Sequence, residues 1–157
     1  MASRRSLIAL ILTALVAACP GPEDDDEASR VVGVQADELG GLAGAVRVVA
    51  KVDDLVQHDD RASGAVPPAA PAREIELRGR AGAKVEVVAE ALAPGAPADA
   101  PPVVTRLATA RMVGGGKKLL RLQLQASCLS APAPGGPPPL VCAAPETCSF
   151  GRCTSSE

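Results

Sequence analysis

Apolar and polar residues alternate with a period of two through much of the chain between residues 73 and 128. The segment 120–128 is the clearest example, because every even position is apolar and every odd position is polar. Successive side chains point to opposite faces of a strand, so this pattern predicts a half-buried strand with Cys128 on its inward face. Segments 73–78 and 84–87 alternate in the same way, and the second continues to residue 92.

Three further segments are rich in β-branched residues and fit strands: 30–34, 46–52 and, less regularly, 103–113. Six or seven strands within about 100 residues predict an all-β fold, an antiparallel β-sandwich with an immunoglobulin-like outline. A small β-barrel is the alternative that this pattern leaves open.

Short glycine-containing segments separate several of these strands. Residues 79–83 form one such turn, and residues 114–116 predict a β-hairpin that leads into the leucine-rich strand. We interpret segments 39–45 and 53–62 as loops or single turns, because neither shows a regular hydrophobic period.

The first eighteen residues have the pattern of an export signal. Residues 1–6 carry two arginines and no acid, and residues 7–18 are twelve residues without a charge. A basic start followed by a short apolar run is typical of a signal peptide. The run is shorter than the roughly 20 apolar residues that span a bilayer, so it does not predict a permanent membrane helix.

This apolar run ends at Cys19, in the sequence Val16-Ala17-Ala18-Cys19. These four residues resemble the lipobox of bacterial lipoproteins, in which an aliphatic and two small residues precede the cysteine. The resemblance implies cleavage after Ala18, a thioether-linked diacylglycerol on Cys19, and a fatty acid such as palmitate on the new amino group. A plain signal peptide with an incidental cysteine is the alternative.

A Pro-Gly-Pro break and five consecutive acids, residues 23–27, follow Cys19. Like charges repel one another and anionic headgroups, so we expect this acidic segment to be an extended tether that holds the folded part away from the membrane. Calcium binding is the weaker alternative, because calcium needs carboxylates arranged around a loop.

Four cysteines remain after Cys19 is set aside: Cys128, Cys142, Cys148 and Cys153. An even number in an exported chain predicts two disulfides, with three possible pairings. Zinc usually needs cysteine pairs two to four residues apart, and only the last spacing comes near. The tail from Cys142 resembles the cysteine-rich ends of small envelope lipoproteins of myxobacteria and, loosely, EGF-type modules, which implies an extracytoplasmic module.

Composition excludes some classes of function. Without residues 1–18 the chain has 139 residues, with 14 Lys and Arg against 18 Asp and Glu. One Phe and no Tyr or Trp leave almost no aromatic surface on which bases could stack, so nucleic-acid binding is not expected. High-affinity interfaces and sugar sites usually have aromatic anchors, and Phe150 alone could provide one here.

The search for catalytic or metal-binding residues gives little. His58 is the only histidine, beside Asp59 and Asp60, and we expect it in a solvated loop rather than in a metal site or a Ser-His-Asp triad. We therefore predict no metal and no cofactor. Glu74 and Glu76 fall on the outward face of a strand, where nothing marks them for acid–base chemistry.

The glycines 114–116 before Lys117 and Lys118 resemble a phosphate-binding loop only superficially, because the Walker spacing fails and a strand follows. These lysines and Arg111 could form a basic tip that contacts anionic polymers, although exposed charges at a turn are usually only solvated.

The sequence therefore predicts four parts: a signal peptide (1–18), an acidic tether (19–28), a β-sandwich (29–128) and a Pro/Gly-rich, Cys-rich tail (129–157). We expect a protein that is not an enzyme, anchored by lipid on Cys19 to the envelope, most simply to the outer membrane, and acting as a binding or structural module. Two alternatives are a subunit of a secretion or motility complex and, less well supported, an accessory protein of a small envelope hydrolase.

Overall fold

A computed structural model describes residues 27–36, 39–63, 73–130 and 140–157. The alternating segments form strands there, and two 3₁₀ helices occupy short connections. The elements are β1 (Glu27–Gln35), η1 (Gly40–Leu42), β2 (Ala45–Val52), β3 (Leu55–Ser63), β4 (Arg73–Arg80), β5 (Lys84–Leu92), β6 (Val104–Arg111), β7 (Lys117–Gln123), η2 (Ala126–Cys128), β8 (Glu146–Ser149) and β9 (Arg152–Ser155).

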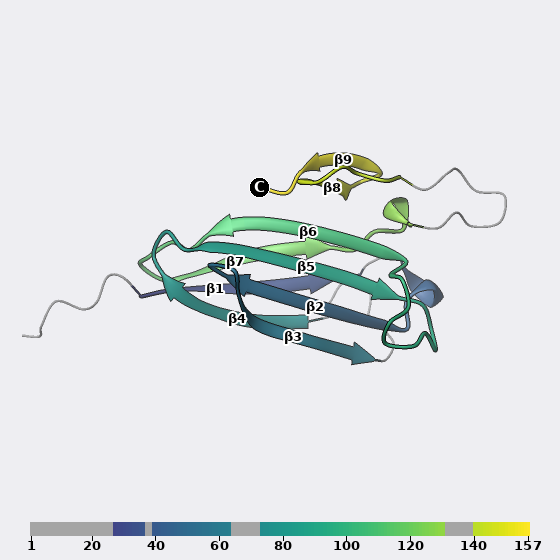
Figure 1. Cartoon of the computed structure of the whole chain (residues 1–157), viewed down its shortest axis with the longest axis horizontal. Coiled ribbons are helices and arrows are strands. Elements are labelled where there is room, and N and C mark those ends of the chain that lie inside the picture. The colour runs from purple at the N-terminus through teal and green to yellow at the C-terminus, as the bar shows by residue number, and fades with distance from the viewer. Residues whose placement is uncertain (1–26, 37–38, 64–72, 131–139) are drawn as a thin grey trace, which may run out of the picture.

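Two sheets face each other and confirm the predicted β-sandwich (Figure 1). One sheet has the strand order β3-β2-β5-β6, and the other has the order β4-β1-β7. All strand pairs are antiparallel except β1 with β7, which is parallel. The likeness to an immunoglobulin domain is one of outline only. Those domains place the first, second, fourth and fifth strands in one sheet, whereas here the first and fourth strands lie in one sheet and the second and fifth in the other.

The core lies between the sheets and contains no aromatic residue. On β5, alternate side chains from Val85 to Ala91 are fully buried, whereas Lys84 and Glu86 face outward. On β7, Leu122 turns inward in the same way. Burying a Val or Leu side chain stabilises a fold by roughly 1.5–3 kcal/mol, so this alternation fixes the register of the sheets.

The prediction of a β-hairpin at residues 114–116 is wrong. Strands β6 and β7 lie in different sheets, and the glycine-rich turn crosses from one sheet to the other. Gly115 and Gly116 have φ angles of 77° and 123°, which only glycine adopts without strain. Residues 81–83 make a second crossing, from β4 to β5. A short turn alone does not distinguish a hairpin from a crossing, because both reverse the chain.

The interpretation of residues 53–62 as a loop is also wrong, because Leu55–Ser63 is the edge strand β3. Residues 57–61 in its middle are all polar, so polar side chains occupy both faces there and the strand shows no hydrophobic alternation. Its bulge places Gln57 against β4, where the side-chain amide donates to the Arg78 carbonyl (2.6 Å) and accepts from the Arg78 N–H (3.1 Å). This pair of hydrogen bonds joins the two sheets along one side.

Two strand boundaries differ from expectation. Strand β1 begins at Glu27, so Glu27 and Ala28, which we placed in the acidic tether, belong to the sheet. Strand β7 ends at Gln123, and Cys128 is buried in the 3₁₀ helix η2 instead of lying on that strand.

No helix within the described ranges is long and apolar enough to cross a membrane.

Candidate functional site

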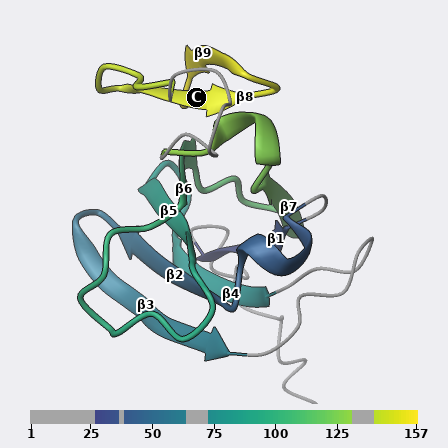
Figure 2. The same cartoon turned by 90° about the vertical axis from the view of Figure 1, so that its right-hand side faces the viewer.

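The C-terminal hairpin of β8 and β9 lies outside the sandwich, beyond strand β6, as Figure 2 shows. Two disulfides hold it, Cys128–Cys148 and Cys142–Cys153, so the prediction of two disulfides is confirmed, and this is the one of the three possible pairings that forms. The first joins β8 to η2 on the sandwich, and the second closes within the tail. Cys19, the predicted lipidation site, lies outside the described residues.

The tail covers the free edge of β6. The Leu107 N–H donates to Thr147 Oγ1 at 2.9 Å, and the Thr109 N–H donates to the Ser156 carbonyl at 2.6 Å. Both acceptor residues are buried, with 4% of Thr147 and 6% of Ser156 exposed. Unpaired edges invite other strands to add to a sheet, so the tail protects this edge.

Arg106 also lies on β6. Its side chain points between the sheets, because it lies in register with the buried Ala89 of β5. Its guanidinium donates to the Cys148 carbonyl in β8, while its Nε atom is buried without a hydrogen-bond partner among the described residues. Burial lowers the pKa of Arg106, because desolvation disfavours the charged form. The tail therefore provides a polar partner for a cation at the open side of the sandwich.

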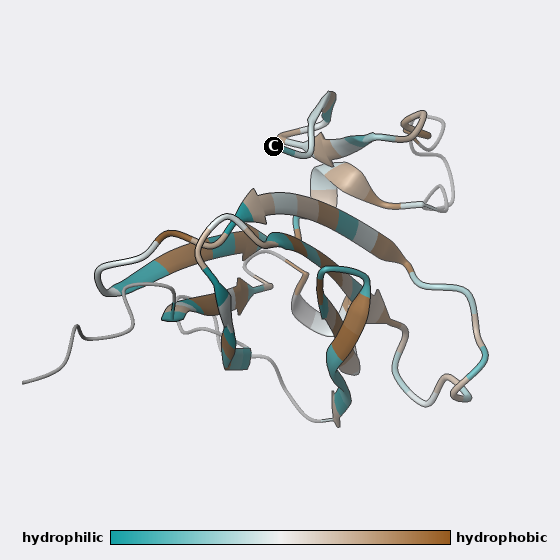
Figure 3. Ribbon diagram, turned by 60° about the vertical axis from the view of Figure 1, so that its left-hand side comes forward, coloured by the Kyte–Doolittle hydropathy of each residue, from teal (hydrophilic) through white to brown (hydrophobic). Residues whose placement is uncertain are grey.

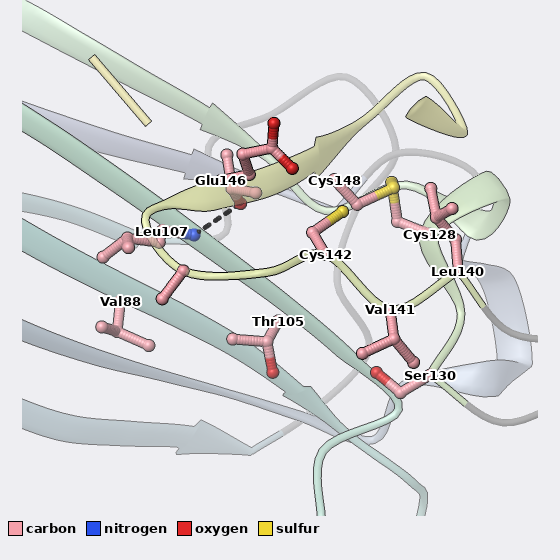
Figure 4. A pocket seen from close by; sticks show the side chains of 12 residues that line it. Val88, Thr105, Leu107, Cys128, Ser130, Leu140, Val141, Cys142, Glu146 and Cys148 are labelled. Carbon is pink, nitrogen blue, oxygen red and sulfur yellow. Dashed lines mark hydrogen bonds between the residues drawn. A yellow bond between two sulfur atoms is a disulfide. The ribbon is translucent and has the colours of Figure 1, made fainter. Parts of the chain in front are cut away.

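A groove of about 440 Å³ runs between the tail and the outer face of the sheet (Figure 4). We call it the tail groove. The sheet contributes Val88 and Leu107, which are cross-strand neighbours, and the tail contributes Leu140 and Val141. The side chain of Val141 is 83% exposed. The groove is mostly apolar and falls within the usual size range of ligand pockets, so it can accept an apolar group.

A second cavity of about 790 Å³ lies where the end of the tail meets β6 and β7. Its cations are already engaged, because Lys84 pairs with Glu86 at 3.4 Å and Arg111 donates to the Gly82 carbonyl at 3.1 Å. The Glu157 carboxylate lines the same cavity. Its mixture of charges indicates no particular ligand.

His58 lies on β3 and is half-buried, not in the solvated loop that we expected. It shares the inward side of the strand with Asp60, whereas Asp59 faces outward beside Val49. Asp59 binds Arg47 through two hydrogen bonds of 2.9 and 3.0 Å, which lower the pKa of its carboxyl. Within the described ranges no three His, Cys, Asp or Glu residues are arranged to hold a metal ion.

Glu74 and Glu76 lie on the exposed face of β4, as the alternation predicted. Glu76 accepts a hydrogen bond from Lys117 at 2.9 Å, and this bond is the main reason why its pKa lies below the ordinary value. The basic side chains near the crossing turn are therefore partly neutralised by their neighbours.

Comparison of the chain with protein-family models, curated proteins and solved structures found no match.

The tail groove is the feature of the candidate site that sequence reasoning missed. Its only signal in the sequence is the apolar pair Leu140-Val141 directly before Cys142, in a segment otherwise rich in proline and glycine.

Proposed function

We propose that this chain is a lipid-anchored protein of the bacterial envelope that acts as a binding or structural module and not as an enzyme. The observation that carries the proposal is the pair of disulfides that fixes the tail to the sandwich. Disulfides form and persist in oxidising compartments outside the cytoplasm. The export pattern of residues 1–18 and the lipobox-like sequence ending at Cys19 support the same location.

The proposed anchor is physically sufficient. One acyl chain gives only marginal binding to a bilayer, whereas two or more hold a protein stably, at about 0.8 kcal/mol per buried CH₂ group. A diacylglycerol on Cys19 with a further acyl group on its nitrogen therefore needs no membrane-spanning segment.

The arrangement of charged groups supports binding over catalysis. The two carboxylates with lowered pKa values, Asp59 and Glu76, form ion pairs on the outer faces with Arg47 and Lys117. Catalytic acids and bases usually lie in clefts with pKa values shifted toward neutrality. The tail groove instead offers apolar side chains and a single carboxylate, that of Glu146, which suits contact with an apolar group.

Metabolic labelling tests the anchor. Cells that express the chain are grown with radiolabelled palmitate, and the chain is followed by gel and by membrane fractionation. We expect label and membrane recovery in the wild type and in a C128A/C148A variant, which keeps Cys19 but loses one disulfide. Both should be lost in C19A. Label that persists in C19A would refute lipidation at this residue.

A further inference from the structure

The covered edge of β6 has an unusual set of partners. Strand β6 pairs with β5 on one side only, and its other edge bonds to the tail. The acceptors there are a side-chain hydroxyl, from Thr147, and a carbonyl beyond the end of β9, from Ser156. Neither contact is a backbone bond from a strand paired with β6. The tail therefore takes the place of a neighbouring strand at this edge.

Backbone groups alternate in direction along a strand, so Thr105, Leu107 and Thr109 all direct their N–H and C=O groups to this edge. An antiparallel copy of β6 related by a twofold axis at Leu107 places Leu107 opposite its own copy and Thr105 opposite Thr109. Each of these pairs has the hydrogen-bonded geometry of an antiparallel ladder. The two β6 strands then join their sheets into one continuous sheet, and the hydrophobic cores of the two copies lie on the same side of it.

The side chains of this register are compatible with one another. Leu107 meets Leu107, and threonine meets threonine, which are favourable cross-strand pairs. Arg106 faces Ala108 of the copy, so the two arginine side chains are not placed opposite each other. Strand β6 contains neither proline nor a carboxylate that would oppose this pairing.

We infer that the edge of β6 is a strand-addition surface that fits a second copy of this chain, and that the tail keeps it covered. Cys128–Cys148 is the bond that holds this cover, because Cys142–Cys153 closes within the tail. A small dithiol reduces Cys128–Cys148 to two thiols with transfer of two electrons and two protons, and the dithiol becomes a disulfide. The tail is then joined to the sandwich covalently only through the chain between η2 and Leu140, and otherwise by its hydrogen bonds to β6.

The oligomeric state tests this inference. A chain in which a cleavable secretory signal replaces residues 1–19 lacks both the apolar segment and the lipid attachment site, so its mass can be measured in water by light scattering. We expect monomer mass for the oxidised chain. C128A/C148A in the same background, and the oxidised chain after treatment with dithiothreitol, should both show a twofold mass. Far-UV circular dichroism verifies that each sample keeps its strands.

A charge exchange locates the contact. In the C128A/C148A background, Leu107→Lys and Leu107→Asp each place like charges across the twofold axis, so each variant should remain a monomer. Their equimolar mixture should regain the twofold mass, because lysine then faces aspartate. Val49→Lys, on the same outer face but two strands away, should leave the dimer intact.

The inference is overturned if the folded C128A/C148A and reduced samples stay at monomer mass. It is equally overturned if Leu107→Lys or Leu107→Asp alone still forms the dimer, or if mixing them has no effect. A dimer that Val49→Lys abolishes would show contact through the face of the sheet instead of the edge of β6.

Discussion

Removal of the Cys128–Cys148 disulfide should lower the free energy of unfolding by about 3 kcal/mol. The disulfide joins residues separated by 20 positions. In the chain-entropy model a crosslink of this span costs the denatured state about 11 cal/mol/K, or roughly 3.3 kcal/mol at 25 °C. Both cysteines are buried, and their truncation to alanine also removes packing contacts of the sulfur atoms, so the loss should be at least of this size.

The assay is urea unfolding of C128A/C148A followed by far-UV circular dichroism, since the chain contains no tryptophan. Leu107→Lys is included in both samples, so that association does not add to stability. The midpoint should fall and the slope should rise, because the uncrosslinked denatured state exposes more surface.

One control variant makes the result decisive. C142A/C153A removes a crosslink with a separation of 11, for which the same model gives roughly 2.8 kcal/mol. A loss below about 1 kcal/mol in C128A/C148A would refute the reasoning, since the disulfide would then not restrict the denatured chain as the entropy model requires.

Three more perturbations follow from the contacts. Gly44→Ala should cost about 1–3 kcal/mol or more, because its Cβ would lie 2.4 Å from backbone of the facing loop, whereas Gly41→Ala, with nothing within 4 Å, should be nearly neutral. Gln57→Ala should cost about 1–2 kcal/mol, because it removes both hydrogen bonds between β3 and β4. Asp59→Asn should lower stability at neutral pH, because Arg47 lowers the folded-state pKa of Asp59.

The urea midpoint of each variant measures the change in stability for all three perturbations. The contribution of Asp59 is present above its unfolded pKa of about 3.9 and is lost as pH falls through the lower folded pKa, so wild type and Asp59→Asn should converge in acid. A gap that persists at low pH, or equal midpoints for the two glycine variants, would contradict these predictions. So would a Gln57→Ala chain whose Arg78 amide exchanges hydrogen no faster than in the wild type.

The sequence predicts those parts of the fold that bury one face. Figure 3 shows apolar and polar residues alternating along the central strands, where a slip of one residue would expose the core. The edge strand β3 is missed because both its faces carry polar groups. The crossing after Met112 is missed because strand pairing depends on contacts that are distant in the sequence, such as β7 beside β1.

The candidate site is less predictable than the fold. Cysteine number and spacing predict two disulfides, but not which of three pairings forms, because pairing depends on where η2 places Cys128. The tail groove arises only when Leu140 and Val141 lie above the outer face of β5 and β6. An isolated pair of apolar residues in a proline-rich segment carries no periodicity from which such packing could be inferred.

The intact mass of the chain purified from its native membrane tests the central proposal most directly. We predict a chain that begins at Cys19, carries a diacylglyceryl group and a fatty acyl group, and has its other four cysteines oxidised. Release of the mass increment by digestion would localise both lipid groups to the N-terminal peptide. A chain with an unmodified Cys19, or with cysteines that react with an alkylating agent before reduction, would contradict the proposal.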